Sequence, residues 1–129
     1  MAKSELVVLT KSKELVEYIF TITKNSPKLF RFTFVNRMQN LCLDLVSELF
    51  IANRIYIKVG DDVALGKRRF HQNEALTKVY LLGYVSYLAM RQECITKKQY
   101  EYISTLIKEL VDMIGFWAKS DQVRMKKNG

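Results

Sequence analysis

From Tyr100 to Trp117, apolar residues recur at steps of three and four without interruption, and polar residues occupy the opposite face. This spacing places one apolar stripe along an α-helix and does not match the two-residue period of a β-strand. Just before the stripe, Thr96 and Gln99 form a capping-box pattern, in which each side chain bonds the backbone N–H of the other residue. The sequence therefore predicts a helix that begins after Thr96.

The same apolar spacing predicts three more helices, over residues 11–24, 34–58 and 67–92. Thr10 is the expected N-cap of the first of these helices, because its hydroxyl can accept a bond from a free backbone N–H. Pro27 ends that helix, since the residue before a proline is disfavoured in helical backbone.

Residues that break helices are few, since the sequence has one proline and five glycines. This composition favours long helices joined by short loops. At 129 residues and 49% apolar composition, the chain can build one domain with its own core. We expect an all-α fold: an antiparallel up-down-up-down four-helix bundle in a single domain. Residues 1–9 are expected to form an arm or a helix extension, residues 10–120 the bundle, and residues 121–129 a basic flexible tail.

The stretch from Val79 to Met90 is apolar on nearly every face. A helix of a small monomeric bundle keeps a polar side, so we expect another subunit to cover part of this stretch. The apolar arc of the last helix is also wide. The residues expected at a subunit interface are Val79, Leu82, Val85, Leu88, Leu106 and Met113.

Residues that could support catalysis or metal binding are few. The single histidine, His71, lies beside three cations with nothing to orient its ring, so a structural or surface role is favoured. Asp44 and Glu48 share a helical face, where a solvated or salt-bridged pair is more typical than a metal site. Cys42 and Cys94 have apolar neighbours and are expected to act as small, reduced apolar residues. We expect no enzyme, no metal and no cofactor.

The formal net charge is +8, from 21 Lys and Arg against 13 Asp and Glu, which is typical of proteins that bind polyanions. A charge surplus that only improves solubility is the alternative. The cations form two clusters that an antiparallel bundle would place at opposite ends. The expected nucleic-acid-binding residues are Lys24, Lys28, Arg31 and Arg37 in the first cluster, and Arg54, Lys58, Lys67, Arg68 and Arg69 in the second.

Phenylalanines alternate with the cations of the first cluster at Phe30, Phe32 and Phe34. Aromatic rings beside cations suit base stacking next to phosphate contacts. Alternatively, the rings close the end of the core. We favour the core interpretation for Phe32 and Phe34 and leave both open for Phe30.

Several stretches resemble the Avd accessory proteins of diversity-generating retroelements: Ser26 to Leu45, Phe50 to Arg54, Ile95 to Tyr102, and Ile114 to Ser120. The resemblance covers most of the chain from about Leu15 to Ser120. It implies a four-helix bundle that assembles as a ring-like homopentamer with a basic surface. It also implies binding to a reverse transcriptase and its template RNA, in a complex that makes error-prone cDNA.

The resemblance carries no catalytic residues over to this chain. Arg31, Arg37 and Arg54 fall at positions where the family tends to be basic. The same superfamily includes bundle proteins encoded in intervening sequences of ribosomal RNA genes, so a second implied role is a structural or protein-interaction bundle.

Our leading hypothesis is thus an accessory nucleic-acid-binding protein that associates with a reverse transcriptase and its template RNA or cDNA. A structural or protein-interaction bundle is the alternative, and an enzyme is disfavoured because the usual catalytic constellations are missing. The first residues lack the apolar segment of a secretory signal. The longest uncharged run of the chain, from Val79 to Met90, is too short for a membrane span. We therefore expect a cytoplasmic protein without membrane contact.

Overall fold

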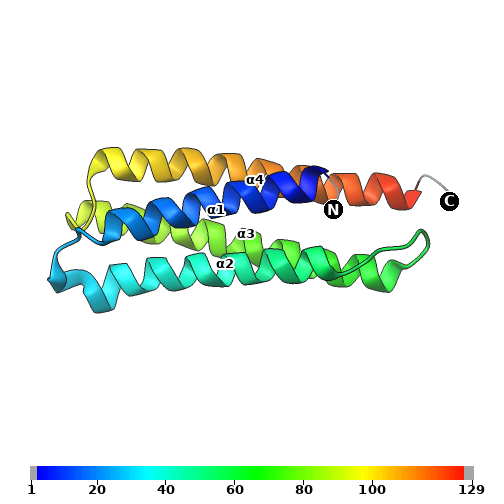
Figure 1. The fold of residues 1–129 in the computed structure, drawn as a ribbon, viewed down its shortest axis with the longest axis horizontal. Helices are drawn as coiled ribbons and strands as arrows, with labels where there is room; N and C mark the ends of the chain where they lie inside the picture. Colours follow the sequence, from blue (N-terminus) through cyan, green and yellow to red (C-terminus); the bar gives the residue numbers. More distant parts are fainter. Residues whose placement is uncertain (1–2, 127–129) are drawn as a thin grey trace.

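Four helices make up most of residues 3–126, the part of the chain that the computed structural model describes (Figure 1). Their bounds are α1 Lys3–Thr23, α2 Asn36–Arg54, α3 Asp62–Arg91 and α4 Lys97–Lys126. No strand occurs within the described residues. The predicted all-α four-helix bundle is confirmed.

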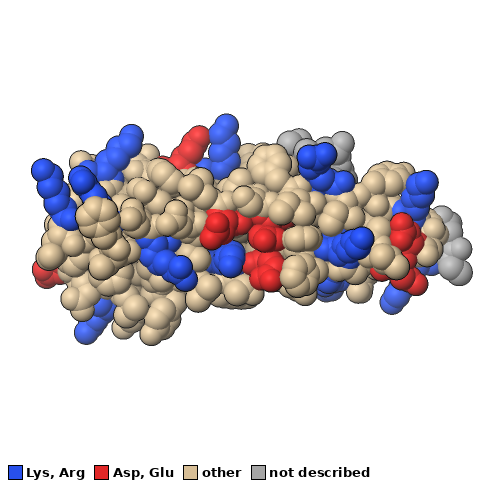
Figure 2. All heavy atoms as spheres, turned by 90° about the horizontal axis from the view of Figure 1, so that it is seen from below, with Lys and Arg blue, Asp and Glu red and all other residues tan. Residues whose placement is uncertain are grey.

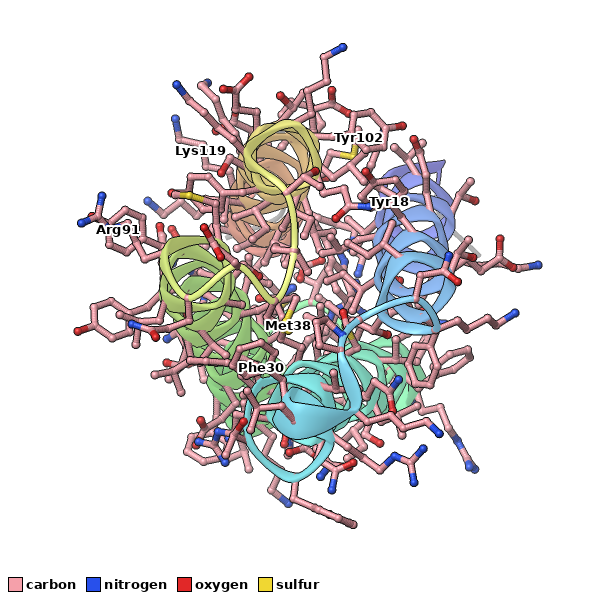
Figure 3. All side chains as sticks on the ribbon, turned by 90° about the vertical axis from the view of Figure 1, so that its left-hand side faces the viewer. Tyr18, Phe30, Met38, Arg91, Tyr102 and Lys119 are labelled. Atoms are coloured by element: carbon pink, nitrogen blue, oxygen red, sulfur yellow. The ribbon has the colours of Figure 1, made fainter. Side chains whose placement is uncertain are left out.

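The helices form a ring in cross-section, with α1 and α3 each packed between α2 and α4 (Figure 3). Tyr18 of α1 and Tyr102 of α4 meet edge to face, with ring centroids 4.6 Å apart. Successive helices run in opposite directions, so residues 24–35 and 92–96 connect helices at one end of the bundle (Figure 1). We call this the double-loop end, and the opposite end, where residues 55–61 join α2 to α3, the single-loop end.

All four helices contribute fully buried side chains to one core. Along α4, Ile103, Leu110, Ile114 and Trp117 are buried and Ile107 packs beside them, as the spacing from Tyr100 to Trp117 predicted. Each fully buried aliphatic side chain contributes about 1.5–3 kcal/mol relative to an exposed one. The core members from the other helices include Leu15 and Ile19, Met38 and Leu45, and Val79 and Leu82.

The predicted capping box at the start of α4 is confirmed. The backbone N–H of Gln99 donates to Thr96 Oγ1 over 3.0 Å, and the backbone N–H of Thr96 donates to Gln99 Oε1 over 2.9 Å. At the start of α3, Asp61 is the N-cap, and its carboxylate accepts a bond from the backbone N–H of Ala64 over 3.1 Å. These side chains satisfy backbone donors that the first turn of a helix leaves free.

Helices α1 and α4 extend beyond their predicted bounds, α1 at its start and α4 at its end. Helix α1 begins at Lys3, so Thr10 lies inside a helix and the N-cap prediction was wrong. The buried Val8 continues the apolar stripe of α1 toward the N-terminus, which explains the extension. Helix α4 runs to Lys126, because Asp121 is buried and holds the last turns to the bundle. The tail predicted from residue 121 is therefore helical up to this point, and residues 127–129 lie outside the described residues.

Helix α2 is shorter than predicted at both ends. A single 3-10 turn, Lys28–Phe30, and a π-helical segment, Arg31–Val35, precede it. Helix α2 then ends at Arg54 instead of near residue 58, because Ile55 takes an extended backbone and Ile57 turns back into the core. Helix α3 begins at Asp62, earlier than predicted, and includes Gly66.

Candidate nucleic-acid interface

Seven exposed cations surround the double-loop end of the bundle. Residues 24–40 and 91–99 contain one acid, Glu93, so the local formal charge is 7 − 1 = +6. We call these seven residues the basic cluster: Lys24, Lys28, Arg31, Arg37, Arg91, Lys97 and Lys98.

The antiparallel topology brings together two parts of this cluster. The first four cations come from the α1–α2 connection and the start of α2, and they were predicted as a group. Arg91, Lys97 and Lys98 flank the α3–α4 connection, and the sequence analysis missed them. The topology could have predicted their place, because in an up-down-up-down bundle the first and third connections lie at the same end. Viewed onto this end, Arg91 points outward from α3 (Figure 3).

None of the seven cations forms an ion pair with another described residue. Elsewhere, several cations pair with acids: Lys11, for example, pairs with Glu14 and Glu109, and both bonds raise the pKa of the Lys11 ammonium group. On the face that α2 presents, Lys and Arg predominate at the double-loop end, whereas Asp and Glu are interspersed with them toward the middle and the other end (Figure 2). Unpaired, exposed cations are available to bind phosphate groups.

The three phenylalanines of this end differ in exposure. Phe30 and Phe34 are half-buried against the core, with ring centroids 5.7 Å apart. Phe32, between them, has 82% of its surface exposed. The core interpretation is therefore confirmed for Phe34, and Phe30 also packs on the core, but it was wrong for Phe32. Side chains two residues apart in this helical segment point in nearly opposite directions. Because Phe30 and Phe34 point toward the core, Phe32 between them points toward solvent.

Arg68 does not belong to a nucleic-acid interface, and its prediction was wrong. Its side chain is 3% exposed, and its Nε lies 2.9 Å from Oδ2 of the buried Asp121. The guanidinium also donates to the backbone oxygen of Ile55 over 3.1 Å and lies 4.9 Å from the centre of the Trp117 ring. Sequence reasoning counted Arg68 with its exposed neighbours because Asp121 is distant in the chain.

The other cations of the second predicted cluster are less available to phosphate groups than predicted. Arg69 is half-buried and donates to the backbone oxygen of Ala118 over 3.4 Å. Arg54, Lys58 and Lys67 are exposed, but Asp61 and Asp62 lie between them in the α2–α3 connection and the first turn of α3, at the same end of the bundle. The two predicted clusters do lie at opposite ends. With Lys119, Arg124 and Lys126 of α4, the single-loop end is also positive, but three acids, Asp61, Asp62 and Asp121, lie among its cations, against one at the double-loop end.

Three of the six residues predicted at a subunit interface were assigned wrongly. Val79, Leu82 and Leu106 are buried in the core of a single chain and have no surface to offer a second one. Val85, Leu88 and Met113 are half-buried, so the structure leaves their predicted role open. The exposed residues of the same stretch of α3 were missed: Tyr80, Leu81, Tyr84 and Tyr87.

His71 is oriented by a partner that sequence reasoning did not assign to it. Its Nδ1 lies 2.6 Å from Oε2 of Glu48, and both side chains are half-buried between α2 and α3. Glu48 is therefore within hydrogen-bonding distance of His71, whereas Asp44 is exposed to solvent. Within the described residues, no three His, Cys, Asp or Glu side chains lie close enough to hold a metal ion.

Both cysteines are free thiols in apolar surroundings. Burial raises the pKa of the Cys42 thiol to about 12 and also raises the pKa of Cys94. Such thiols remain protonated near neutral pH and are poor nucleophiles. None of the helices over residues 3–126 combines the length and hydropathy that a membrane span requires.

Fold and site together define a four-helix bundle protein with a cluster of unpaired cations at its double-loop end. A family model described as bAvd-like matches residues 6–121, and the chain belongs to this family, as its sequence predicted. Membership suggests a bundle protein linked to diversity-generating retroelements, and the bAvd-like family is not a known family of enzymes.

A solved structure shares the fold. It is a protein with unknown function from the S23 ribosomal protein family of Bacteroides thetaiotaomicron VPI-5482, with a TM-score of 0.74 and 20% sequence identity. The similarity covers 90% of this chain and 98% of that one. Among curated proteins, none matches the sequence.

Proposed function

We propose that this protein is an accessory nucleic-acid-binding subunit of a diversity-generating retroelement. In this role it binds the template RNA or its cDNA, associates with the reverse transcriptase, and supports cDNA synthesis in the cytoplasm without chemistry of its own. Membership in the bAvd-like family supports the link to the retroelement. The basic cluster at the double-loop end supports nucleic-acid binding.

The single observation behind this proposal is that seven exposed cations at one end have no ion-pair partner among the described residues. Binding of a polyanion releases its counterions, so the affinity falls with salt. For single strands the logarithmic slope is about −0.7 per phosphate contact, which gives roughly −5 if all seven cations engage. Each contact contributes a factor of about 5 in affinity at 0.1 M salt by the same relation.

Charge reversal at the two ends tests the proposal. The variant K28E/R31E/R37E removes three cations of the basic cluster, and R54E/K58E/K67E makes the same charge change at the single-loop end. Fluorescence anisotropy with labelled single-stranded RNA should show a loss of at least about 100-fold at 0.1 M salt for the first variant, with a salt slope near −3.

The second variant should stay within about fivefold of the unmodified protein. All six positions are exposed, so the helical circular dichroism should be unchanged in both variants. Equal losses at the two ends, or no salt-dependent binding by the unmodified protein, would contradict the proposal.

An exposed aromatic row on α3 supports association with other proteins. Tyr80, Tyr84 and Tyr87 are 42–64% exposed, and tyrosine is enriched at protein interfaces. On this basis we propose that the protein forms a homo-oligomer, as the ring-like pentamer of its family implies. Light scattering coupled to size exclusion should give a mass about five times 15.1 kDa, and Y80E/Y84E should reduce it; a monomer at micromolar concentration would refute the assembly.

The same row favours the alternative function, a protein-interaction bundle that does not contact nucleic acid. The two functions differ in one measurement, because the alternative predicts the oligomer without any retention of RNA. Co-purification with the reverse transcriptase in the presence of ribonuclease would further show whether the enzyme is bound directly or through RNA.

A further inference from the structure

A groove of about 500 Å³ lies beside the basic cluster, between the start of α2 and the last turns of α3. Val85 and Leu88 of α3 are half-buried along it and give it an apolar wall. The exposed ring of Phe32 forms part of its lining. Flat apolar surfaces of this kind suit a planar, weakly polar ligand such as a nucleobase.

Two carboxamides give the same groove hydrogen-bonding capacity. Asn36 and Asn40 both line the groove, and they are four residues apart in α2 and therefore on one face. Both side chains are exposed, and neither bonds another described residue. A carboxamide carries a donor and an acceptor side by side, which matches the edge of a nucleobase. Neither an acidic nor a purely apolar partner would use both groups.

A cation completes the set. Arg37 lies between the two asparagines in sequence, lines the groove, and belongs to the basic cluster. A nucleotide whose base entered the groove would place its phosphate at the rim, where the cluster supplies positive charge without a competing ion pair. The groove therefore combines stacking, base-edge bonding and phosphate contact within a few side chains.

We propose that this groove binds one or two unstacked bases of single-stranded nucleic acid. Phe32 stacks on a base, Asn36 and Asn40 bond its edge, and Arg37 contacts the adjoining phosphate. This inference rests on the proposed function and narrows it, because a base inside a duplex exposes neither its face nor its pairing edge to such a groove. The ligand is a single strand or a loop.

The test compares two ligands with the same number of phosphates: a 12-nucleotide oligouridine and an abasic phosphodiester of equal length. The F32A variant and the N36A/N40A variant should each bind oligouridine about tenfold more weakly, which lies within the range for loss of one stacking aromatic. Their affinity for the abasic ligand should be unchanged. The two variants should lose the same factor in affinity for oligodeoxythymidine, because the proposed contacts are to bases and not to 2′-hydroxyls.

Matched controls lie outside the double-loop end. Phe116 is 68% exposed on α4 and Asn73 is exposed on α3, so F116A and N73A should leave both affinities unchanged. Photocrosslinking with 5-bromouridine should label the peptide that contains Phe32 and not the one that contains Phe116.

Two failures are distinguishable. If F32A and N36A/N40A lost no affinity for oligouridine, or lost affinity for the abasic ligand equally, the base groove would be refuted while phosphate binding stood. If the unmodified protein bound neither ligand, the proposed function itself would fail. Tighter binding of a duplex than of the single strand would also overturn the base groove.

Discussion

Removing the carboxylate of Asp121 should destabilise the bundle by about 3–5 kcal/mol, the range for breaking a buried ion pair from one side. Oδ2 of Asp121 forms an ion pair with Arg68 Nε at 2.9 Å and accepts a hydrogen bond from Gln72 Nε2 over 3.0 Å. All three residues are at least 97% buried. The D121A variant therefore leaves a buried guanidinium and a buried amide without their shared acceptor.

The magnitude also follows from the individual bonds. A hydrogen bond to a charged group contributes about 1.5–3 kcal/mol, and the Gln72 hydrogen bond and the Arg68 ion pair, each taken at this value, together give about 3–6 kcal/mol. Since domains of this size are stable by about 5–15 kcal/mol, such a loss is a large part of the total. Urea unfolding followed by circular dichroism at 222 nm and by Trp117 fluorescence would measure it.

A double variant separates the ion pair from simple packing. R68M alone should cost a similar amount to D121A, because it leaves the Asp121 carboxylate buried without its cation. The combined R68M/D121A change should cost clearly less than the sum, since no uncompensated charge remains. A loss below about 1 kcal/mol for D121A, or strict additivity of the two changes, would refute the reasoning; RNA affinity should be unaffected, because the pair lies far from the basic cluster.

Three further predictions concern local features. T96A should cost about 1 kcal/mol in urea unfolding, because the Gln99 N–H loses its cap; an unchanged midpoint would contradict this. G60A should cost about 1 kcal/mol, since Gly60 has a φ of +87°, and a neutral result would argue against that turn conformation. At pH 8 a thiol whose pKa is about 12 is ionised in about one molecule in ten thousand, so Ellman's reagent should release colour from Cys42 only as the protein unfolds; prompt reaction in the native state would contradict its burial.

Local patterns in the sequence predicted the parts of the fold that depend on local interactions. The three-four spacing before Trp117 and the capping box at Thr96 each lie within one helix, and the structure confirms both. The start of α1 was predicted too late, because a threonine at position 10 resembles an N-cap when the buried Val8 before it is not taken into account. Helix boundaries depend on which residues the other helices cover.

The sequence predicted the basic cluster only where its cations lie close together in one segment of the chain. Lys24 to Arg37 form a cluster in the sequence, but Arg91 and Lys97 join it through the topology of the bundle. Arg68 and Asp121 are far apart in the chain, so their pairing left no local pattern. Phe32 was assigned to the core as one of the rings closing its end, but only Phe30 and Phe34 pack on the core, and Phe32 between them is exposed.

The antiparallel arrangement of the helices has an electrostatic consequence for how the molecule meets its ligand. Neighbouring helices point in opposite directions, so their macrodipoles largely cancel, while the side-chain charges do not. The double-loop end holds a formal charge of +6, and residues 54–69 and 119–126 at the single-loop end hold 8 − 3 = +5, whereas residues 41–53, 70–90 and 100–118 between the two ends hold 2 − 6 = −4. The 30-residue helices separate the two ends by about 45 Å. Positive charge is thus concentrated at the two tips of the rod, and the field of a polyanion should turn the protein tip-first before contact. The association rate of the protein with the polyanion should therefore fall as salt is added. At 0.1 M salt the Debye length is about 10 Å, well below the length of the rod.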